Sequence, residues 1–234
     1  MSQSDRKRRF LFFMIPTLCF LMISCSCSEL TDKPIKNPDL HLEINVTPID
    51  EEKAAFSTEE MISIKAIMKN RIDSLGASSN SISIQEQNLL IDILGYTDLE
   101  EVKSVLGKPG KLTFTDEQGS LIVTGDHIKK ITYTMQARME GGVQEPIIKL
   151  EMDEEGKRLF ADGTRRNIGK TITINLDDEV LMAPVVHDTI TNGVVILTFG
   201  GDKNEALHVT QKTAALLKGG AIPAVITIAK AEVR

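Results

Sequence analysis

From residue 42 onward, the pattern of apolar and polar positions predicts short strands alternating with amphipathic helices. Residues 42–46 alternate between apolar and polar side chains, which is typical of a strand with one buried face. Ser57 and Glu60 form a capping-box sequence, and apolar residues then recur every three or four positions over 61–75. We expect this helix to end at Gly76.

The next segments complete the pattern of a small sheet covered by two helices. A polar turn separates strand 82–84 from strand 89–93, and these two strands form a hairpin. Asp98 begins a helix that ends at Gly107, and a further strand starts at 112–114. The order βαββαβ predicts a ferredoxin-like base subdomain over residues 41–115.

The rest of the chain, residues 116–234, is predicted to form a strand-rich α+β head subdomain, so that the fold class is α+β. The expected strands are 131–139, 148–152, 172–176, 180–186, 194–199 and 224–228, with turns at Glu140–Gly142 and Asp177–Asp178, and helices starting near Asp153 and at Asp202. Gly219 and Gly220 are expected to end the last helix, whose apolar side runs to Leu217.

The first 24 residues have the order of an export signal. Arg6–Arg9 are basic, and the apolar run 10–23 is shorter than the roughly 20 residues that cross a bilayer. Leu21–Cys25 resembles a bacterial lipobox, which predicts cleavage after residue 24 and a lipid on Cys25. An ordinary signal peptide with incidental cysteines, or a short uncleaved anchor, is the alternative. Polar residues 25–40 are expected to form a tether.

These features predict a protein held at the cell membrane, on its extracytoplasmic face, by a lipid anchor. All three cysteines lie within residues 1–27, so no disulfide can support the folded part. The net charge is −6, and the basic leader leaves the rest of the chain more acidic still. With no basic run and no tryptophan, the composition argues against a nucleic-acid partner.

No motif in the sequence indicates catalysis or a cofactor. The four histidines are far apart and lack metal-ligand spacing, so we expect no metal and no other cofactor. Asp153–Glu155 lie at an expected helix start and Asp177–Asp178 at a hairpin tip, where acidic residues have structural roles. Nucleophile motifs are absent as well. The sequence therefore predicts a protein that is not an enzyme.

A long-range pattern resembles the first periplasmic domain, base plus head, of SecD, the accessory subunit of the bacterial Sec translocase. The similarity covers residues 42–230 and includes Arg71, Asp73, Gly76, Gly125, Thr164, Asn167, Gly169, Pro184, Gly193, Gly220 and Pro223. We interpret most of these residues as structural, because glycines suit turns and caps, and Thr164 and Asn167 suit a helix end.

The resemblance implies a domain that binds translocating or unfolded polypeptides and assists protein export. SecD proper continues into a membrane bundle that couples ion movement to export together with SecF, whereas this sequence stops at Arg234. The expected role is therefore polypeptide handling without ion coupling of its own. Possible partners are exported polypeptides, Sec translocase components and, through the lipid, the membrane. The alternative function is a scaffold lipoprotein that binds a folded membrane or envelope partner.

Overall fold

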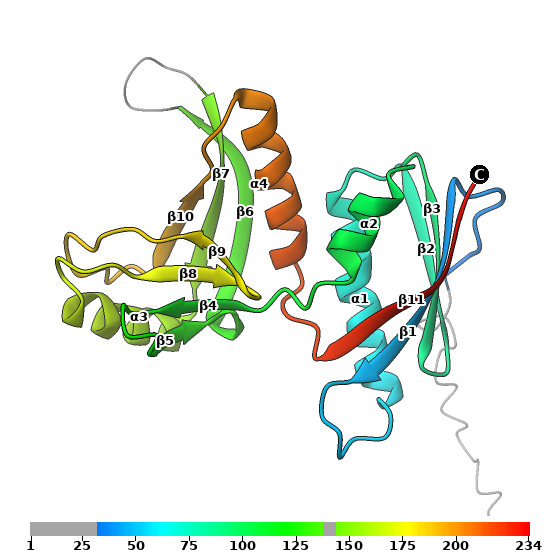
Figure 1. The fold of residues 1–234 in the computed structure, drawn as a ribbon, viewed down its shortest axis with the longest axis horizontal. Coiled ribbons are helices and arrows are strands. Elements are labelled where there is room, and N and C mark those ends of the chain that lie inside the picture. Colours follow the sequence, from blue (N-terminus) through cyan, green and yellow to red (C-terminus); the bar gives the residue numbers. More distant parts are fainter. Residues whose placement is uncertain (1–31, 138–143) are drawn as a thin grey trace, which may run out of the picture.

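The computed structural model describes residues 32–137 and 144–234, which form two subdomains joined side by side (Figure 1). The base consists of β1 (Leu40–Pro48), α1 (Thr58–Ser74), β2 (Ser79–Gln85), β3 (Asn88–Leu94), α2 (Leu99–Leu106) and β11 (Ala224–Val233). All elements between α2 and β11 belong to the head. The head is thus an insertion into the base, and two chain segments connect the subdomains.

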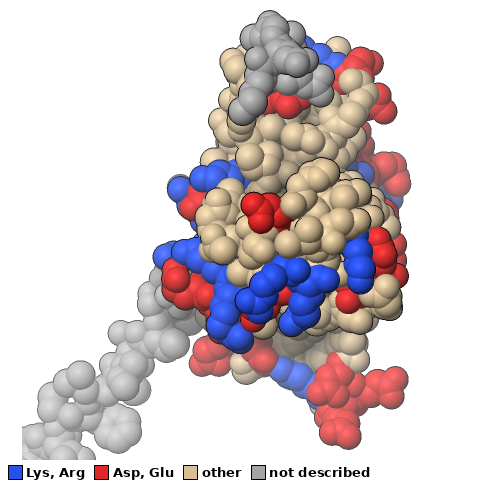
Figure 2. Space-filling view, turned by 90° about the vertical axis from the view of Figure 1, so that its left-hand side faces the viewer, with Lys and Arg blue, Asp and Glu red and all other residues tan. Residues whose placement is uncertain are grey.

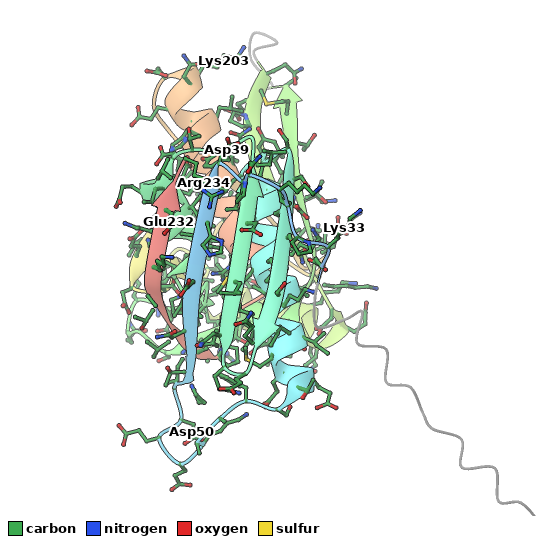
Figure 3. All side chains as sticks on the ribbon, turned by 90° about the vertical axis from the view of Figure 1, so that its right-hand side faces the viewer. Lys33, Asp39, Asp50, Lys203, Glu232 and Arg234 are labelled. Carbon is green, nitrogen blue, oxygen red and sulfur yellow. The ribbon has the colours of Figure 1, made fainter. Side chains whose placement is uncertain are left out.

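The base is an antiparallel sheet with the strand order β11-β1-β3-β2. The helices α1 and α2 cover the face of this sheet that is turned toward the head, and the other face is uncovered (Figures 1 and 3). Alternate residues of β1 from Leu40 to Val46 point into the core with α1. The βαββαβ order and the α+β class are therefore confirmed.

One strand of the base differs from the sequence-based prediction. Residues 112–115 form β4 (Leu112–Thr115), which pairs with strands of the head, whereas β11 takes the fourth place in the base sheet. Leu112 and Phe114 pack into the core of the head, and Ile226 and Ile228 pack against that of the base. The predicted boundary at residue 115 was therefore wrong. Both segments have the same alternating pattern, which does not reveal which of them belongs to the base.

The predicted ends of the helices are confirmed. The Ser57 hydroxyl accepts a hydrogen bond from the Glu60 amide, and the Glu60 carboxylate accepts one from the Ser57 amide. Gly76 follows α1 with φ at +88°, a conformation that glycine adopts without strain. The helices α2, α3 (Glu154–Arg166) and α4 (Lys203–Leu217) begin after the N-cap residues Asp98, Asp153 and Asp202.

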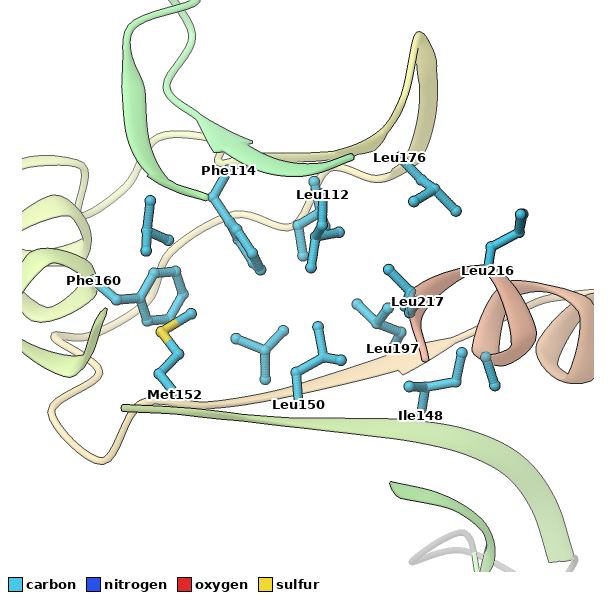
Figure 4. Packing of buried hydrophobic residues seen from close by; sticks show 14 of the residues in the cluster. Leu112, Phe114, Ile148, Leu150, Met152, Phe160, Leu176, Leu197, Leu216 and Leu217 are labelled. Carbon is cyan, nitrogen blue, oxygen red and sulfur yellow. The ribbon is translucent and has the colours of Figure 1, made fainter. Parts of the chain in front are cut away.

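The head contains two antiparallel sheets. One has the order β10-β7-β6, with β6 at Ile128–Ala137, β7 at Gln144–Met152 and β10 at Val194–Thr198. The other has the order β5-β4-β8-β9, with β5 at Leu121–Thr124, β8 at Thr173–Leu176 and β9 at Glu179–Met182. Their apolar faces meet α3 and α4 in one core (Figure 4). In this core the rings of Phe114 and Phe160 pack edge to face, with their centroids 5.5 Å apart.

Two details of the head differ from the sequence-based prediction. The strand expected over 180–186 ends at Met182, because Pro184 has no amide hydrogen and Val185 and Val186 form only isolated bridges. The strand β5 was not predicted at all. The turn at Asp177 is confirmed, with φ at +56°, while the expected turn Glu140–Gly142 lies outside the described residues.

The expected tether is described from Asp32 onward, and its last residues are bonded to the base. The Asp39 amide donates to the Ile93 carbonyl at 2.9 Å, and the Asp39 carboxylate accepts from the Gly95 amide at 2.6 Å. The expected leader and Cys25 lie outside the described residues. Within the described part of the chain, no helix has the length and apolar character needed to cross a membrane.

Candidate functional site

The residues singled out from the sequence gather in two places. Arg71, Gly220 and Pro223 lie where the base meets the head, and Gly125 lines a hollow beside that junction together with Gly220. Asp73 and Gly76 lie close by at the end of α1. The others, Thr164, Asn167, Gly169, Pro184 and Gly193, surround a groove on the head. The structure thus defines a junction cluster and a groove cluster.

Arg71 is the centre of the junction cluster. It lies on α1, is fully buried, and donates hydrogen bonds to the carbonyls of Val105 at 3.1 Å, Pro109 at 2.8 Å and Lys108. Burial lowers the pKa of Arg71 to about 10, although the Asp177 charge opposes the shift. The guanidinium therefore stays charged at neutral pH, and it holds the segment that leads from the base into the head.

The head binds the same segment through Asp177. Its carboxylate accepts hydrogen bonds from the amides of Lys111 at 2.8 Å and Gly110 at 3.2 Å. Gly110 has φ at +80°, and a Cβ atom there would lie 2.4 Å from Arg71 Nη2. Only glycine therefore fits between the two charged side chains.

The second connection between the subdomains crosses the first. The Ile222 amide donates to the Pro109 carbonyl at 2.8 Å, so this carbonyl accepts from both Arg71 and Ile222. Gly219 and Gly220 have φ at +90° and +86°, which turns the chain out of α4 toward β11. The junction cluster is thus a structural joint in which hydrogen bonds from Arg71, Asp177 and Ile222 hold the first connection.

The groove cluster has a different character, because it is apolar and open. A hollow of about 370 Å³ lies between β10 and the segment 184–190, and its floor includes Phe160, Ile172 and Ile174. Val185 is 49% exposed and Ile196 is 44% exposed, although both are large and apolar. Exposed apolar side chains around a hollow are typical of a binding surface.

Residues that were interpreted as structural hold one wall of this groove. The buried Thr164 hydroxyl donates to the Phe160 carbonyl at 2.8 Å and accepts from the Ile190 amide at 3.0 Å. Gly169 donates its amide to the Val186 carbonyl at 2.8 Å. The segment 184–190 is therefore fixed to the end of α3.

Asn167 and Pro184 stabilise the same region. The Asn167 side-chain amide donates to the Gly163 carbonyl at 2.9 Å, which closes the end of α3. The Pro184 carbonyl accepts from the Ile172 amide at 3.0 Å, and the proline ring lines the groove. Val185 and Ile196 were not among the residues predicted from the sequence. For Val185, the available signal was the apolar pair Val185–Val186 directly after Pro184. Neighbouring residues of a strand point to opposite faces, so a strand at this place would bury only one of the two.

The strand β10 offers backbone groups on the other side of the groove. It is the outer strand of its sheet and pairs only with β7 among the described strands. The Gly193 carbonyl accepts from the Met152 amide of β7 at 2.9 Å, while the Val194 amide donates to its neighbour Asn192 at 3.0 Å. Because strands alternate, Ile196 and Thr198 also direct their backbone groups away from β7. Among the described strands, none pairs with Ile196 and Thr198 on this side, so this part of the edge can accept another strand.

The floor of the groove is apolar, Asp188 lines its rim, and other charged residues lie beside it. Figure 2 looks onto this end of the head, where Lys and Arg side chains, interleaved with Asp and Glu, lie below an area of mostly uncharged residues. On α3, Arg158 pairs with Glu155 and Arg165 pairs with Asp162. The Gly156 amide, as the main cause, and His127 lower the pKa of Asp153, as suits an N-cap carboxylate.

Among the described residues, no three His, Cys, Asp or Glu side chains are arranged to hold a metal. The acidic residues that could suggest acid–base chemistry serve local structure instead. Asp153 caps α3 and Asp177 binds the junction. The lining of the groove is mainly apolar, which favours contact with apolar groups.

Two family models match the chain. Residues 103–224 match the model described as "SecDF, P1 head subdomain", and residues 61–119 match "Protein translocase subunit SecDF, P1 domain, N-terminal". The first match alone covers more than half of the chain, and together they span both subdomains.

Curated relatives and solved structures agree with these models. The protein translocase subunit SecD of Dictyoglomus turgidum is 34% identical over 164 residues, which is 69% of this chain and 39% of the relative. That of Acidaminococcus fermentans is also 34% identical, over 67% of this chain and 36% of the relative. The chain thus spans well under half the length of these relatives.

Two solved structures share the fold at low sequence identity. A SecDF crystal structure in the super-membrane-facing form has a TM-score of 0.64 and 20% identity, over 87% of this chain and 30% of that one. A structure described as a membrane component SecDF that enhances protein export has a TM-score of 0.60 and 21% identity, over 83% of this chain and 99% of that one. The chain belongs to the SecD family and corresponds to the first periplasmic domain of SecD, with its base and head subdomains.

Proposed function

We propose that this chain takes part in protein export on the extracytoplasmic side of a membrane, by binding extended segments of translocating or unfolded polypeptides. The head subdomain carries this activity, and the groove next to the free edge of β10 is the observation on which the proposal depends. The family membership supports the setting, because the relatives are named as subunits of a protein translocase.

An extended polypeptide suits both halves of this site. Its backbone can add to β10 as a further strand, which requires little sequence preference because every residue except proline offers an amide and a carbonyl. Alternate side chains of such a strand point the same way, so an apolar one can enter the groove between Val185 and Ile196. Folded proteins bury both kinds of group. The site therefore distinguishes unfolded from folded chains.

The expected affinity is low. A single strand edge and one apolar groove suit dissociation constants from micromolar to millimolar, or about −8 to −4 kcal/mol. Such complexes dissociate fast enough to release a moving polypeptide. Binding requires no nucleotide, divalent metal or ion gradient, because the contacts are apolar and between backbone groups.

We also propose that Cys25 is the first residue of the mature chain and carries a lipid anchor. Two or more acyl chains hold a protein stably at a bilayer, whereas one gives only marginal binding. Mass spectrometry of the N-terminal peptide tests this proposal directly. An unmodified N-terminus at another residue, or normal membrane retention of Cys25→Ser, contradicts it.

Titration of the full chain with a fluorescent peptide from an unfolded exported protein tests the polypeptide site. Ile196→Asp places a charge in the apolar groove and is expected to weaken binding at least tenfold. The matched control is Val225→Asp, at a 53% exposed apolar position of β11 in the base. Equal affinities of the two variants would show that the peptide binds elsewhere.

A second peptide separates the two kinds of contact. Methylating every other backbone nitrogen removes the hydrogen bonds of one strand edge but leaves the side chains in place. We expect this peptide to bind several times more weakly than the unmethylated one. If both bind equally, the groove acts through side chains alone and β10 adds no strand.

The uncovered face of the base sheet favours a second function, that of a scaffold for a folded partner. This face carries linked charges, with His41 Nδ1 2.7 Å from Asp92 Oδ1 and Lys230 Nζ 2.9 Å from Glu232 Oε1. Capture of one stoichiometric folded protein from cells, together with no binding of unfolded chains, would favour the scaffold. Crosslinking in intact cells identifies which species is bound.

A further inference from the structure

We propose that one edge of the base sheet faces anionic lipid headgroups when the chain is anchored. This lysine edge consists of Lys33, Lys36 and Lys69. Lys69 donates to Asn80 of β2, and Lys33 and Lys36 follow Asp32, whose amide faces Ile82 of the same strand. The inference rests on the proposed lipid at Cys25 and adds how the anchored domain is oriented on the membrane. Two observations support it, the place where the chain joins the base and the local charge, and the short connection keeps both within reach of the membrane.

The chain joins the base at the outer strand β2. The Asp32 carboxylate pairs with Lys65 Nζ at 3.0 Å through one oxygen and accepts from the Ile82 amide at 3.2 Å through the other. The Asp32 amide faces the Ile82 carbonyl at 3.4 Å. Lys65 lies on α1 with a side chain that is only 9% exposed. Asp32 therefore fixes the chain between β2 and α1.

The connection to the anchor is short. Seven residue steps separate Cys25 from Asp32, and a fully extended chain of that length spans at most about 25 Å. Asp32 must then lie within this distance of the lipid headgroups. The outer strands β2 and β11 are three strand spacings apart, or about 14 Å. The connection thus keeps the β2 edge within reach of the membrane. Because about 14 Å is less than about 25 Å, the length alone does not choose between β2 and β11, and the local charge decides which edge faces the lipid.

Local charge favours the same orientation. Asp32 is paired with the buried Lys65, so the lysine edge has three lysines against the nearby carboxylate of Asp73, in a chain whose net charge is −6. Lys33 and Lys36 are exposed and form no ion pair among the described residues. An anionic leaflet attracts each such lysine by about 1 kcal/mol and repels the acidic remainder of the domain. Figure 3 shows Lys33 and Glu232 at opposite edges of the sheet.

This orientation has a consequence for partners. A sheet that stands on one edge keeps its uncovered face perpendicular to the membrane. The charged groups of that face, such as His41 and Lys230, are then accessible from the side to a protein embedded in the same membrane.

Fluorescence quenching on vesicles tests the proposal with the full, lipid-modified chain. A fluorophore is placed on a cysteine at one of two sites, Pro34→Cys next to Lys33 or Val233→Cys at the opposite edge. Pro34 and Val233 are both exposed. Each variant also carries Cys27→Ser, so that only the chosen cysteine is labelled. The vesicles contain phosphatidylglycerol and nitroxide-labelled headgroups. We expect quenching at position 34 to exceed that at position 233 several times. Equal quenching, or more at position 233, overturns the proposal.

Two controls identify the cause of the orientation. Replacing Lys36 and Lys69 with glutamine, or using neutral phosphatidylcholine vesicles, is expected to reduce the difference between the two positions. A difference that persists in both controls would contradict the role of charge. If the chain does not attach to vesicles, the anchor and the orientation are both wrong. Peptide binding in solution reports separately on the proposed export function.

Discussion

Arg71 of the base and Asp177 of the head bind the same linker from opposite sides. The arginine donates to the carbonyls of Lys108 and Pro109, and the aspartate accepts from the amides of Gly110 and Lys111. Gly110 is buried and Lys108 and Pro109 are half-buried, so water has little access to these backbone groups and protein partners satisfy them instead. The two charged side chains supply those partners and thereby join the subdomains.

Removal of Arg71 is expected to destabilise the whole chain. In Arg71→Ala, carbonyls of the linker lose their donors and Asp177 loses its nearby charge, so the free energy of unfolding should fall by about 3 to 5 kcal/mol. Arg71→Lys keeps the charge but not the planar fork of donors. Its free energy of unfolding should therefore lie between those of Arg71→Ala and the original chain. Urea denaturation measures both values.

The control for this change is Arg158→Ala on α3. The Arg158 side chain is 61% exposed, and its pairs with Glu155 and Asp162 lie at the surface. Exposed ion pairs contribute little to stability because solvent screens them, so this variant should be close to the original. Similar losses for the two arginines would mean that the buried contacts of Arg71 add nothing to stability.

The apolar stripe of α1 gives a second prediction. Ile72 is fully buried in the core of the base, so Ile72→Ala should lower the free energy of unfolding by about 2 to 5 kcal/mol. Lys69 lies on the same helix, is half-buried, and donates to Asn80 at 3.0 Å, so Lys69→Ala should cost less than about 1 kcal/mol. Thermal or urea unfolding compares the two. Equal costs would show that the helix does not pack as described.

The sequence was sufficient for features whose signals are local. The capping box at Ser57 and the apolar spacing over 61–75 define α1, since both depend on residues within a few positions. It was insufficient for strand pairing. The segments 112–115 and 224–233 have similar alternation, and only packing across more than a hundred residues decides which one closes the base.

The candidate site was predictable in part for the same reason. Thr164, Gly169 and Pro184 were identified through the resemblance, but the groove exists only because α3, the segment 184–190 and β10 meet in space. Lys65 is another example. A lysine at that position of a helix is normally exposed, and it is buried here because Asp32 crosses over it.

Acid should release the contact of Asp32. Burial alone would raise the pKa of this carboxyl, but hydrogen bonds from Lys65 and from the Ile82 amide, with the Lys65 charge, hold it below its usual range. A lowered pKa in the folded state stabilises the protein above the unfolded value of about 4, and this contribution disappears as the pH falls through the folded pKa.

The unfolding free energies of the original chain and of Asp32→Asn, measured at several pH values, test this expectation. At pH 7 the variant should be less stable by about 1 to 3 kcal/mol, because it loses a charge-assisted hydrogen bond. The difference should shrink below about pH 4 and vanish in stronger acid. A difference that does not change with pH would mean that the Asp32 charge makes no contribution.

Thr164 provides a test of how the groove is held together. In Thr164→Val the shape is nearly kept, but the Ile190 amide loses the hydroxyl that accepts its hydrogen bond at 3.0 Å. A half-buried amide without a partner costs about 1 to 3 kcal/mol. The segment 184–190 should also open more often. Hydrogen exchange at the Ile190 amide is therefore expected to speed up by a factor of ten or more, and peptide binding to weaken.

Thr210→Val on α4 is the matched control. Thr210 is equally buried, but its hydroxyl only donates to the Ala206 carbonyl of the same helix, and that carbonyl keeps its place in the helical hydrogen-bond pattern. This variant should leave both exchange at Ile190 and peptide binding unchanged. If Thr164→Val behaves like Thr210→Val, the hydroxyl of Thr164 does not support the groove wall. The polypeptide site would then depend on the apolar contacts of Pro184 and its neighbours alone.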